Sequence, residues 1–272
     1  MAAPVITLLS DFGARDGYVG IMKGVILGIC PSVRLVDLTH DVSRQGIRAG
    51  ALVLRHAVEY FSGAPVHLAV VDPGVGSARA PILVVTERGV LVGPDNGLLA
   101  PAAAALGFRE ARRLEAVRFF RPSVSRTFHG RDVFAPVAAH LAAGVPPDRF
   151  GPLLAHMRPL ALPVPRCEAG RITGEVIHVD HFGNLITNIT ADAAAALGSR
   201  SLAAELPGDR IVPLVEAYAD VAEGAPLAIV NSWGCLEIAV RDGDAAQALA
   251  AGTGTAVSVR VQPPFSDESD GR

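Results

Sequence analysis

Three uninterrupted apolar runs near the start of the chain limit the folds open to it. They read VITLLSD, VRLVD and VHLAVVD, and they end at Asp11, Asp37 and Asp72. Runs without alternating polar residues are typical of strands that are buried on both faces, as in parallel sheets. Residues 17–29 and 47–61, between the runs, carry apolar side chains at helical spacing. This repeated strand, helix, strand order predicts a mostly parallel sheet with helices on both faces.

The pattern changes in the middle of the chain. Residues 82–97 predict a hairpin or two short strands, and residues 132–144 predict a helix. Six prolines fall between residues 146 and 165, which predicts a linker because proline interrupts helices and sheets alike. Beyond it the apolar runs are short and separated by Gly, Asp and Pro, as in antiparallel sheets. These runs are RITGEVIHV, NLITNIT, RIVPLV, PLAIV, CLEIAV and TAVSVRV.

Together these patterns predict two domains of different class. The first is an α/β N-terminal domain with a mostly parallel sheet, expected at residues 1–145. A Pro-rich linker at 146–166 leads to a smaller all-β, barrel-like C-terminal domain at 167–262. Residues 263–272 have no apolar face and are expected to form a disordered tail.

The composition narrows the class of partner. The chain is 50% hydrophobic with a net charge of −3, so it can bury full cores but offers no basic stripe for nucleic acid. Charged residues interrupt every apolar segment before the roughly 18 residues that a membrane span needs. The first residues lack the basic region of a signal peptide. The sequence therefore favours a cytoplasmic protein that binds a small molecule, with no nucleic acid and no membrane.

Three widely spaced cysteines, without a CxxC pair, are expected to be reduced and buried. They predict neither a zinc site nor a redox couple.

Polar residues at the strand ends are the first candidates for a site. In a parallel sheet the carboxyl ends of the strands meet at one edge, where ligands gather. A single strand-end aspartate is most often a turn or cap residue. Three of them in one predicted sheet favour a polar cleft.

The third run continues into DPGVGSAR, which offers an acid, a rigid Pro-Gly turn and an arginine. It is not a phosphate-binding loop, because that motif ends in GK followed by Ser or Thr, and the only lysine lies elsewhere. Arg79 can fold back toward Asp72. On these residues alone, a structural salt bridge across the turn and a catalytic pair are equally good interpretations.

A further polar cluster, TFHGRDVFAP, precedes the predicted helix at 132–144 and contains His129. A lone histidine in such a place is more often a structural hydrogen-bonding group than a catalytic one. A phosphatase-like metal site is another alternative. Its ligands would come from Asp11, Asp37, His40, Asp41, His67 and Asp72. No close ligand spacing supports it, and we expect no metal.

Seven ordered blocks of the chain resemble one enzyme family. They are SDFGARDGYVGIMKGVI, VDLTHDV, VVDPGVGSARAPI, GPDNGLL, TFHGRDVFAPVAAHLA, VDHFGNLITNI and NSWGCLEIAV. Together they are similar to the S-adenosyl-L-methionine hydrolases, also called SAM hydroxide adenosyltransferases, which are relatives of the fluorinating and chlorinating enzymes. The resemblance runs from about residue 6 to about residue 261.

The resemblance implies an activity and an assembly. Family members join an α/β domain to a β-barrel-like domain and form homotrimers, with each site between one subunit's first domain and its neighbour's second. They convert S-adenosyl-L-methionine and water to adenosine and L-methionine, with no cofactor. The family's catalytic Asp-Arg-His set falls on Asp72, Arg79 and His129. The sulfonium is already a good leaving group, so these residues are expected to place and activate a water.

The resemblance also assigns binding residues. Asp11 falls on the carboxylate that holds the ribose hydroxyls, Asp180 on the acid that meets the methionine amine, and Asn184 on the amide that reads adenine. The remaining substrate-binding assignments are Phe182 and Trp233 at the purine, Ser232 and Glu237 in the NSWGCLE block, and Tyr18 at the methionine end. The alternative for the second-domain residues is an ordinary turn between strands.

Other functions stay open at this point. A SAM-dependent halogenase would make a 5′-halo-5′-deoxyadenosine, but its halide needs a small, dry pocket, and a charged Asp-Arg-His set favours water instead. A metal-dependent phosphatase and a non-catalytic nucleoside-binding trimer are the remaining alternatives. Whether Asp72 or His129 takes the proton of the water is not decided by the sequence.

Overall fold

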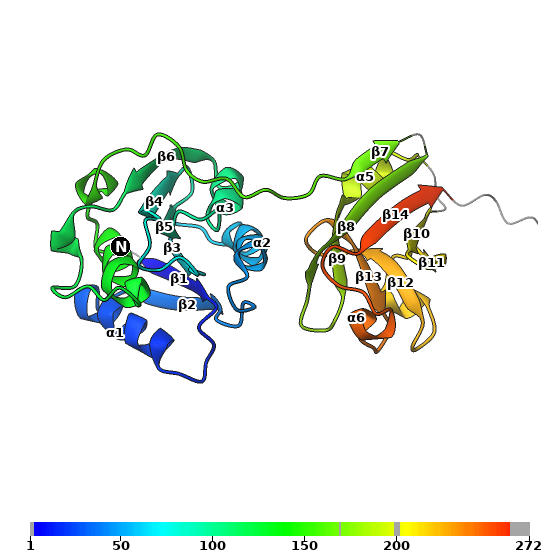
Figure 1. Ribbon diagram of the computed structural model, residues 1–272, viewed down its shortest axis with the longest axis horizontal. Coiled ribbons are helices and arrows are strands. Elements are labelled where there is room, and N and C mark those ends of the chain that lie inside the picture. The colour runs from blue at the N-terminus through cyan, green and yellow to red at the C-terminus, as the bar shows by residue number, and fades with distance from the viewer. Residues whose placement is uncertain (1–2, 169, 199–201, 262–272) are drawn as a thin grey trace, which may run out of the picture. The chain divides into compact units, whose positions relative to one another are not determined.

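The chain divides into two units, Met1–Ala161 and Leu162–Arg272. The computed structural model describes residues 3–168, 170–198 and 202–261, so the tail expected at 263–272 lies outside the described residues. The first unit is built on a mostly parallel sheet with helices and the second on an antiparallel sheet (Figure 1). The predicted fold class is thereby confirmed.

The first unit holds a six-stranded sheet in the order β2-β1-β3-β5-β4-β6. β1, β2, β3 and β5 are parallel neighbours, and β4 runs antiparallel to β5 and β6. The strands are β1 (Val5–Ser10), β2 (Arg34–Thr39), β3 (Val66–Val70), β4 (Pro81–Thr86), β5 (Val90–Pro94) and β6 (Phe108–Arg113). The helices are α1 (Tyr18–Ile29), α2 (Ile47–Val58), α3 (Ala100–Ala105) and α4 (Ala135–Ala142).

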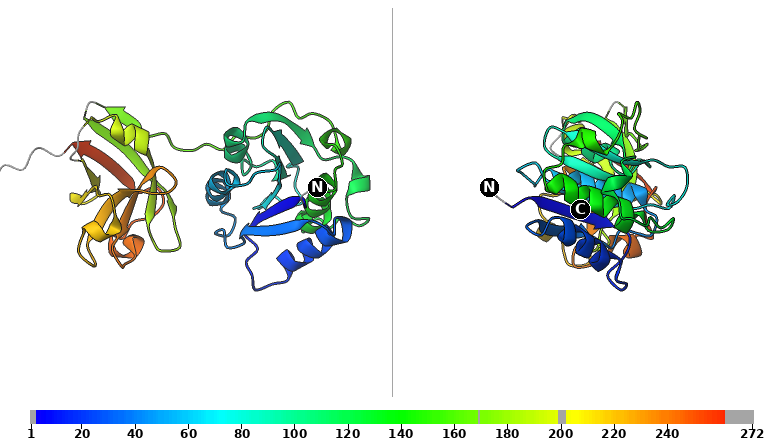
Figure 2. Two further views of the ribbon diagram at one scale, coloured as in Figure 1. Left: turned by 180° about the vertical axis from the view of Figure 1, so that it is seen from behind. Right: turned by 90° about the vertical axis from the view of Figure 1, so that its left-hand side faces the viewer.

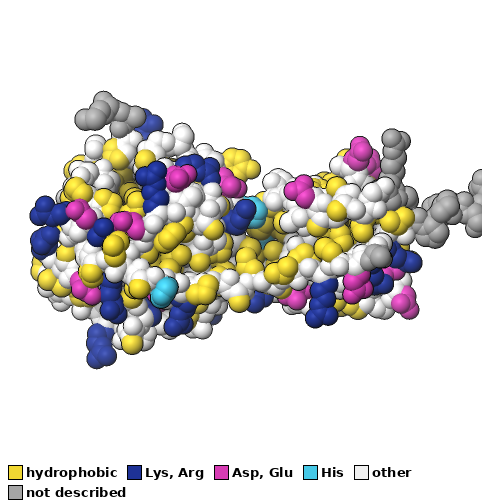
Figure 3. Space-filling model, turned by 90° about the horizontal axis from the view of Figure 1, so that it is seen from above, with side chains coloured by type: hydrophobic (Ala, Val, Ile, Leu, Met, Phe, Trp, Pro, Cys, Tyr) yellow, Lys and Arg dark blue, Asp and Glu magenta, His cyan; other side chains and the backbone are white. Residues whose placement is uncertain are grey.

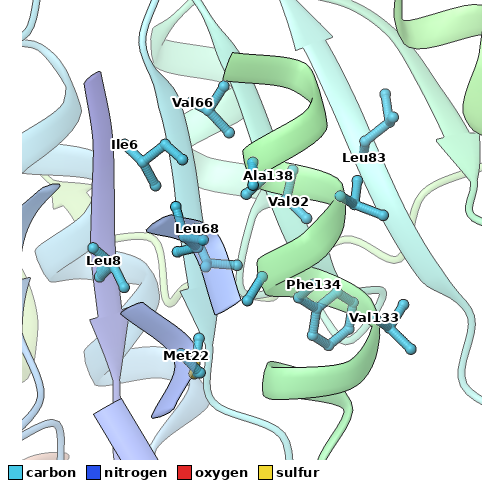
Figure 4. Packing of buried hydrophobic residues seen from close by; sticks show 14 of the residues in the cluster. Ile6, Leu8, Met22, Val66, Leu68, Leu83, Val92, Val133, Phe134 and Ala138 are labelled. Atoms are coloured by element: carbon cyan, nitrogen blue, oxygen red, sulfur yellow. The ribbon is translucent and has the colours of Figure 1, made fainter. Parts of the chain in front are cut away.

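Helices cover both faces of this sheet, which explains the unbroken apolar runs. Ile6 and Leu8 of β1 belong to the cluster that α1 and α4 cover, and Leu9 belongs to the cluster under α2 and α3. Figure 4 shows Leu8 beside Leu68 of β3, with Ala138 of α4 over the same face. Since alternate side chains point to opposite faces, both faces must be apolar. The view from behind in Figure 2 shows helices on either side of this sheet.

The parallel strands end together and so place the loops that follow them. Ser10 at the end of β1 pairs with Val70 at the end of β3. Asp11 and Asp72 therefore follow neighbouring strands at the same edge. Asp37 does not, because β2 continues to Thr39 and Asp37 pairs with Leu8 inside the sheet. The expectation of three strand-end aspartates is thus wrong for Asp37.

The sequence did not predict α3 and β6. α3 reads APAAAA and offers no contrast between a polar and an apolar face. β6 reads FREARR and is an edge strand whose charged side chains hide the apolar alternation.

The proline-rich segment is partly packed on the first unit. A short 3₁₀ turn, Pro147–Phe150, buries Phe150 in the core. Leu153 pairs with Arg112 of β6, and the side chains of Leu154 and Met157 pack on the cluster under α2 and α3. We propose that residues 146–166 connect domains at 1–145 and 167–262. The first part of this linker packs on the first unit.

The second unit is an eight-stranded antiparallel sheet in the order β11-β10-β14-β8-β9-β13-β12, with β7 also paired to β8. The ends of this order meet, because Leu214 after β11 pairs with Ala228 of β12 and Val215 N donates to Ala228 O at 2.9 Å. The sheet is therefore nearly closed into a barrel around one apolar cluster. The strands are β7 (Arg166–Glu168), β8 (Arg171–Val179), β9 (Leu185–Thr190), β10 (Leu202–Leu206), β11 (Arg210–Pro213), β12 (Pro226–Val230), β13 (Cys235–Val240) and β14 (Ala256–Val261).

Two short helices, α5 (Ala191–Ala195) and α6 (Ala245–Ala248), complete this unit together with a 3₁₀ turn at Tyr218–Asp220. Cys167 is exposed on the short strand β7, which corrects the expectation that all three cysteines are buried. Cys30 is buried as expected.

Acidic and basic side chains are interspersed on the face drawn in Figure 3. Within the described ranges, no helix has the length and apolar character needed to cross a membrane.

His67 is a fully buried histidine in β3. Its Nδ1 shares a hydrogen bond of 2.8 Å with Thr7 Oγ1, and the Phe61 ring meets the imidazole edge-on. Burial disfavours the imidazolium and lowers the pKa of His67 to about 4. The folded state therefore binds no proton at His67 in a pH range where the unfolded chain does.

This burial predicts an acid-sensitive fold. Between pH 7.5 and 5 the unfolded chain protonates His67 and the folded chain does not, so stability falls by about 2 kcal/mol from this group. His67→Gln should remove that part of the pH dependence. The measurement is urea unfolding at both pH values, with His156→Gln at an exposed position as the control. An unchanged pH dependence in His67→Gln would contradict the prediction.

Candidate active site

Asp72 and Arg79 form an ion pair across the turn that follows β3. Arg79 Nε donates to Asp72 Oδ1 at 2.8 Å, and Arg79 Nη2 donates to Asp72 Oδ2. The side chains are only 8% exposed for Arg79 and 5% for Asp72. Such a bidentate, nearly buried pair fixes both groups in one plane and is stronger than a surface salt bridge.

The turn itself is shaped so that the arginine can return to the aspartate. Val75 N donates to Asp72 O at 3.2 Å, and Ser77 Oγ donates to Gly74 O at 2.6 Å. A side chain at Gly74 would meet the stem of Arg79 at 3.4 Å. On the other side of Asp72, Asn96 Nδ2 from the GPDNG block donates to Val71 O at 2.8 Å. The strand end and the turn are both held by hydrogen bonds.

Arg79 also reaches His129. Arg79 Nη2 lies 2.9 Å from His129 Nδ1. A guanidinium can only donate, so Nδ1 accepts and the imidazole is neutral with its proton on Nε2. Burial and the charge of Arg79 lower the pKa of His129 and outweigh Asp72 and Asp132, which raise it. The Arg79 guanidinium also stands 5.3 Å from the centre of the Phe134 ring, a cation–π contact.

His129 is positioned by the turn that begins just after it. A π-helical turn, Gly130–Phe134, leads into α4, and Asp132 inside that turn is completely buried. Ser125 N donates to Asp132 Oδ2 at 2.8 Å, and Arg131 donates to both carboxylate oxygens. Burial acts to raise the pKa of Asp132, but these hydrogen bonds outweigh it and hold the pKa below its usual value. The charged carboxylate therefore fastens the loop that carries His129.

Gly76 brings the two loops together. Its φ is +76°, and a Cβ at this position would lie 2.4 Å from Arg126 O in the loop before His129. Only glycine tolerates both the left-handed backbone and the close approach. The second glycine of GVG therefore permits the contact between the two loops.

A cavity of about 340 Å³ opens beside Asp72 and His129. Its aromatic wall consists of Phe12, Tyr18 and Phe128, whose ring centres lie 5.2–5.9 Å apart. The cavity combines an apolar wall with a carboxylate and an imidazole, the usual make-up of a small-molecule site.

Asp11 lies at the start of the loop that contributes Phe12. Its Oδ2 accepts from Gln45 N at 2.8 Å, and within the described ranges the other oxygen has no hydrogen bond. Asp11, Tyr18, Asp72, Arg79 and His129 all belong to the first unit. Among the described residues, no group of three or more His, Cys, Asp or Glu side chains is arranged to hold a metal ion.

The other predicted binding residues lie in two turns of the second unit. Asp180, Phe182 and Asn184 form the β8–β9 turn, where Asp180 Oδ1 accepts from Phe182 N and Asn184 N, both at 2.9 Å. Phe182 is 72% exposed, whereas Asn184 is buried and donates from Nδ2 to Asp180 Oδ2 at 3.2 Å. This turn, with Tyr218, lines a hollow of about 550 Å³.

Ser232 and Trp233 occupy the β12–β13 turn. The Trp233 ring stacks on His178 of β8 with centres 5.4 Å apart, which ties this turn to the strand that leads into Asp180. Glu237 of β13 is buried and accepts from Tyr218 Oη at 2.7 Å and from Asn231 Nδ2 at 3.1 Å. The two oxygens of Glu237 are thus bonded within the protein.

Sequence reasoning missed several residues of these sites. Phe12, Phe128 and Phe134 were not singled out because an aromatic residue next to a motif is more often a core residue. Tyr218 begins a short 3₁₀ turn with no periodic pattern, and its partner Glu237 lies in the strand β13. Among the residues that hold the His129 loop, Asp132 has a local sequence signal, because it is an acid at the start of an apolar helix.

The family models and a curated relative indicate the same enzyme family. The family model for the SAM hydroxide adenosyltransferase N-terminal domain matches residues 6–151, and the model for the C-terminal domain of that family matches residues 174–258. The chain is 46% identical over 250 residues to a protein of Salinispora tropica named (R)-S-adenosyl-L-methionine hydrolase, covering 90% of this chain and 94% of that one.

The chain is also similar to a fluorinase, at lower identity, and to a solved structure of an uncharacterized protein. The chain is 28% identical over 271 residues to a fluorinase of an Actinoplanes species, covering 87% of this chain and 90% of the fluorinase. A crystal structure of an uncharacterized conserved protein from Thermotoga maritima superposes with a TM-score of 0.88 at 38% identity, covering 94% of this chain and 99% of that one.

The close approach at Gly76 yields a prediction. Gly76→Ala should lower the free energy of unfolding by about 2 kcal/mol or more, since it adds a clash to the cost of a left-handed backbone, which is about 1–2 kcal/mol. Gly63→Ala is the matched control, because Gly63 has φ +80° and no atom within 4 Å of the added Cβ. Urea unfolding compares the two, and NMR signals of His129 should shift only in Gly76→Ala. Equal losses for both variants would contradict the prediction.

Proposed function

Since the chain belongs to the SAM hydroxide adenosyltransferase family, we propose that it hydrolyses S-adenosyl-L-methionine to adenosine and L-methionine. The observation that carries the proposal is the linked set of Asp72, Arg79 and His129 beside a cavity of about 340 Å³. The substrate needs no cofactor for this reaction, because its sulfonium is a leaving group already.

The reaction asks the protein chiefly for a placed and activated water. A water oxygen must approach ribose C5′ from the side opposite the C5′–S bond. As that bond breaks, the sulfonium leaves as a neutral thioether. Water forms the C5′–O bond and loses a proton, and the electron pair of the broken C5′–S bond goes to sulfur. Atoms and charge balance with one proton released.

Asp72 is our candidate for the group that takes this proton. The only lone pair of neutral His129, on Nδ1, is occupied by the hydrogen bond from Arg79. Asp72 accepts one hydrogen bond on each oxygen from Arg79, and each carboxylate oxygen can accept a second. His129 then holds the water oxygen by donating from Nε2, and Arg79 stabilises the hydroxide-like character of the water.

For substrate binding we propose the roles that the family resemblance implies. Asp11 would hold the ribose hydroxyls, Asp180 the methionine amine and Asn184 an adenine edge. The other members of the set are Tyr18, Phe182, Ser232, Trp233 and Glu237. Glu237 would act by fixing Tyr218 and Asn231, which its carboxylate already binds. We further propose a cytoplasmic homotrimer in which residues from two subunits complete each site.

The first test is product analysis. The purified protein incubated with S-adenosyl-L-methionine should release adenosine and methionine in equal amounts, measured by chromatography, with or without chelator and with or without chloride or fluoride. Both sulfonium epimers are tested. A 5′-halo-5′-deoxyadenosine in the presence of halide would favour the halogenase. Loss of product on chelation would point to a metal enzyme, and bound nucleoside without turnover to a sensor.

Arg79 should be indispensable for turnover. Arg79→Ala removes the cation and leaves Asp72 unpaired, so kcat should fall by at least about 10²-fold to 10³-fold, as for loss of a main electrostatic group in other enzymes. Adenosine affinity, measured by calorimetry, should be largely kept. Arg112→Ala is the control, because Arg112 makes a comparable ion pair with Glu110 at 2.6 Å in β6, and neither residue is among those that line the cavity. Retained turnover in Arg79→Ala would refute the assigned role.

A further inference from the structure

The single lysine of the chain stands out against its other basic residues. Of the 24 Lys and Arg residues, only Lys23 is a lysine. It lies in α1, and its Nζ donates to Asp37 Oδ2 at 2.5 Å. Both side chains are partly exposed, 31% for Lys23 and 41% for Asp37. An ion pair this exposed adds little to stability. Its role is therefore better judged from the residues to which it is hydrogen-bonded.

The pair is the outer end of a hydrogen-bonded chain that runs into the first unit. Asp37 Oδ1 lies 3.1 Å from His40 Nε2, and His40 Nδ1 lies 2.7 Å from Ser10 Oγ. Ser10 Oγ in turn accepts from Phe12 N at 3.3 Å. Ser10 is only 1% exposed, so the chain passes from a half-exposed ion pair to a buried hydroxyl.

The hydrogen bonds that run from Phe12 to Asp37 can all point the same way, and Lys23 donates to Asp37 from the opposite side. Phe12 N–H donates to Ser10, the Ser10 hydroxyl donates to His40 Nδ1, and His40 Nε2–H donates to Asp37, whose other oxygen receives Lys23. Hydrogen bonds aligned in series polarise and strengthen one another. Burial acts to raise the pKa of Asp37, but the hydrogen bonds from Lys23 and His40 outweigh it and keep the carboxylate charged.

The inner end of the chain is the loop 11–13. Two further backbone bonds join the segment after β2 to this loop and to the strand end before it: Gly13 N donates to His40 O at 2.8 Å, and Val42 N donates to Ser10 O at 3.4 Å. The loop carries Phe12, which lines the cavity beside Asp72 and His129. It also carries Asp11, whose carboxylate is proposed above to hold ribose. Apart from Phe12, none of these network residues is among the residues that line that cavity.

We propose that Lys23, Asp37, His40 and Ser10 form a positioning network, which holds the loop 11–13, and through it the Asp11 carboxylate, in place for substrate without touching it. The inference rests on the proposed function, since it assigns these residues to the same site. Its energetic logic is preorganisation: a loop that is already ordered loses less conformational freedom when substrate binds. The network should therefore matter more for substrate affinity than for folding.

A double-mutant cycle tests this. Lys23→Met removes the charge at the exposed end of the network, and His40→Gln interrupts its centre while keeping a polar side chain. Each should raise KM for S-adenosyl-L-methionine about tenfold, the size of effect of one lost hydrogen bond, with a smaller change in kcat. In an Asp11→Asn background the same changes should raise KM less than about twofold, because they act through Asp11.

Arg55→Met is the matched control. Arg55 and Glu59 form an ion pair of similar exposure, 38% and 41%, on α2, and this variant should leave KM unchanged. Its urea midpoint gives the stability cost of losing such a pair, and Lys23→Met should match it. Equal increases in KM with and without Asp11 would overturn the proposal, as would a Lys23→Met variant with wild-type KM.

Hydrogen exchange separates failure of this inference from failure of the proposed function. Amide exchange at Phe12 and Gly13 in the protein without substrate should be faster in Lys23→Met and His40→Gln than in wild type, and unchanged in Arg55→Met. This readout needs no turnover. If the wild-type protein releases no adenosine but exchange follows this order, the network is real and the proposed reaction is wrong; unchanged exchange overturns the network itself.

Discussion

The candidate active site depends on one guanidinium group. Arg79 binds both oxygens of Asp72, donates to Nδ1 of His129 and stands over the ring of Phe134. His129 and Phe134 come from a loop and the helical turn that follows it, and both are far from Asp72 in the sequence. A planar, permanently charged group with several fixed donors can satisfy them together, whereas an ammonium could not make the same bidentate contact.

The guanidinium also decides what its two polar neighbours can do. By occupying Nδ1 it leaves His129 with a donor on Nε2, and by binding Asp72 along one edge it leaves acceptor capacity on the carboxylate. Burial lowers the pKa of His129, and the same cation lowers it further. The contacts of Arg79 thus leave the histidine with a free donor and the aspartate with free acceptor capacity.

Much of the fold could be predicted because its signals are local. The runs around Leu8 and Leu68 are apolar at every position, since helices cover both faces of the sheet there. Elements without such a signal were missed, as for β6, whose charged residues belong to an edge strand. Asp37 was misplaced for a related reason: the apolar run ends there in the sequence, but backbone pairing continues to Thr39.

The site could be predicted only as a set of residue types and positions. The spacing of Asp72 and Arg79 allowed a salt bridge, but the cation–π contact with Phe134 and the hydrogen bond to His129 depend on how η2 (Gly130–Phe134) and α4 pack. The role of Gly76 was equally hidden, because the carbonyl that excludes a side chain there belongs to Arg126. Long-range contacts of this kind have no local signature.

The three aspartates near the carboxyl edge of the sheet illustrate how environment divides identical side chains among different tasks. Asp37 is half-exposed and neutralised by Lys23, so it serves the network that ends at the loop 11–13. Asp11 accepts one backbone hydrogen bond and keeps an oxygen available, which suits a ligand with hydroxyl groups. Asp72 alone is nearly buried, paired with a cation that cannot lose its charge, and open to the cavity. Of the three, Asp72 is therefore the carboxylate that we propose as the acceptor of the proton of the attacking water.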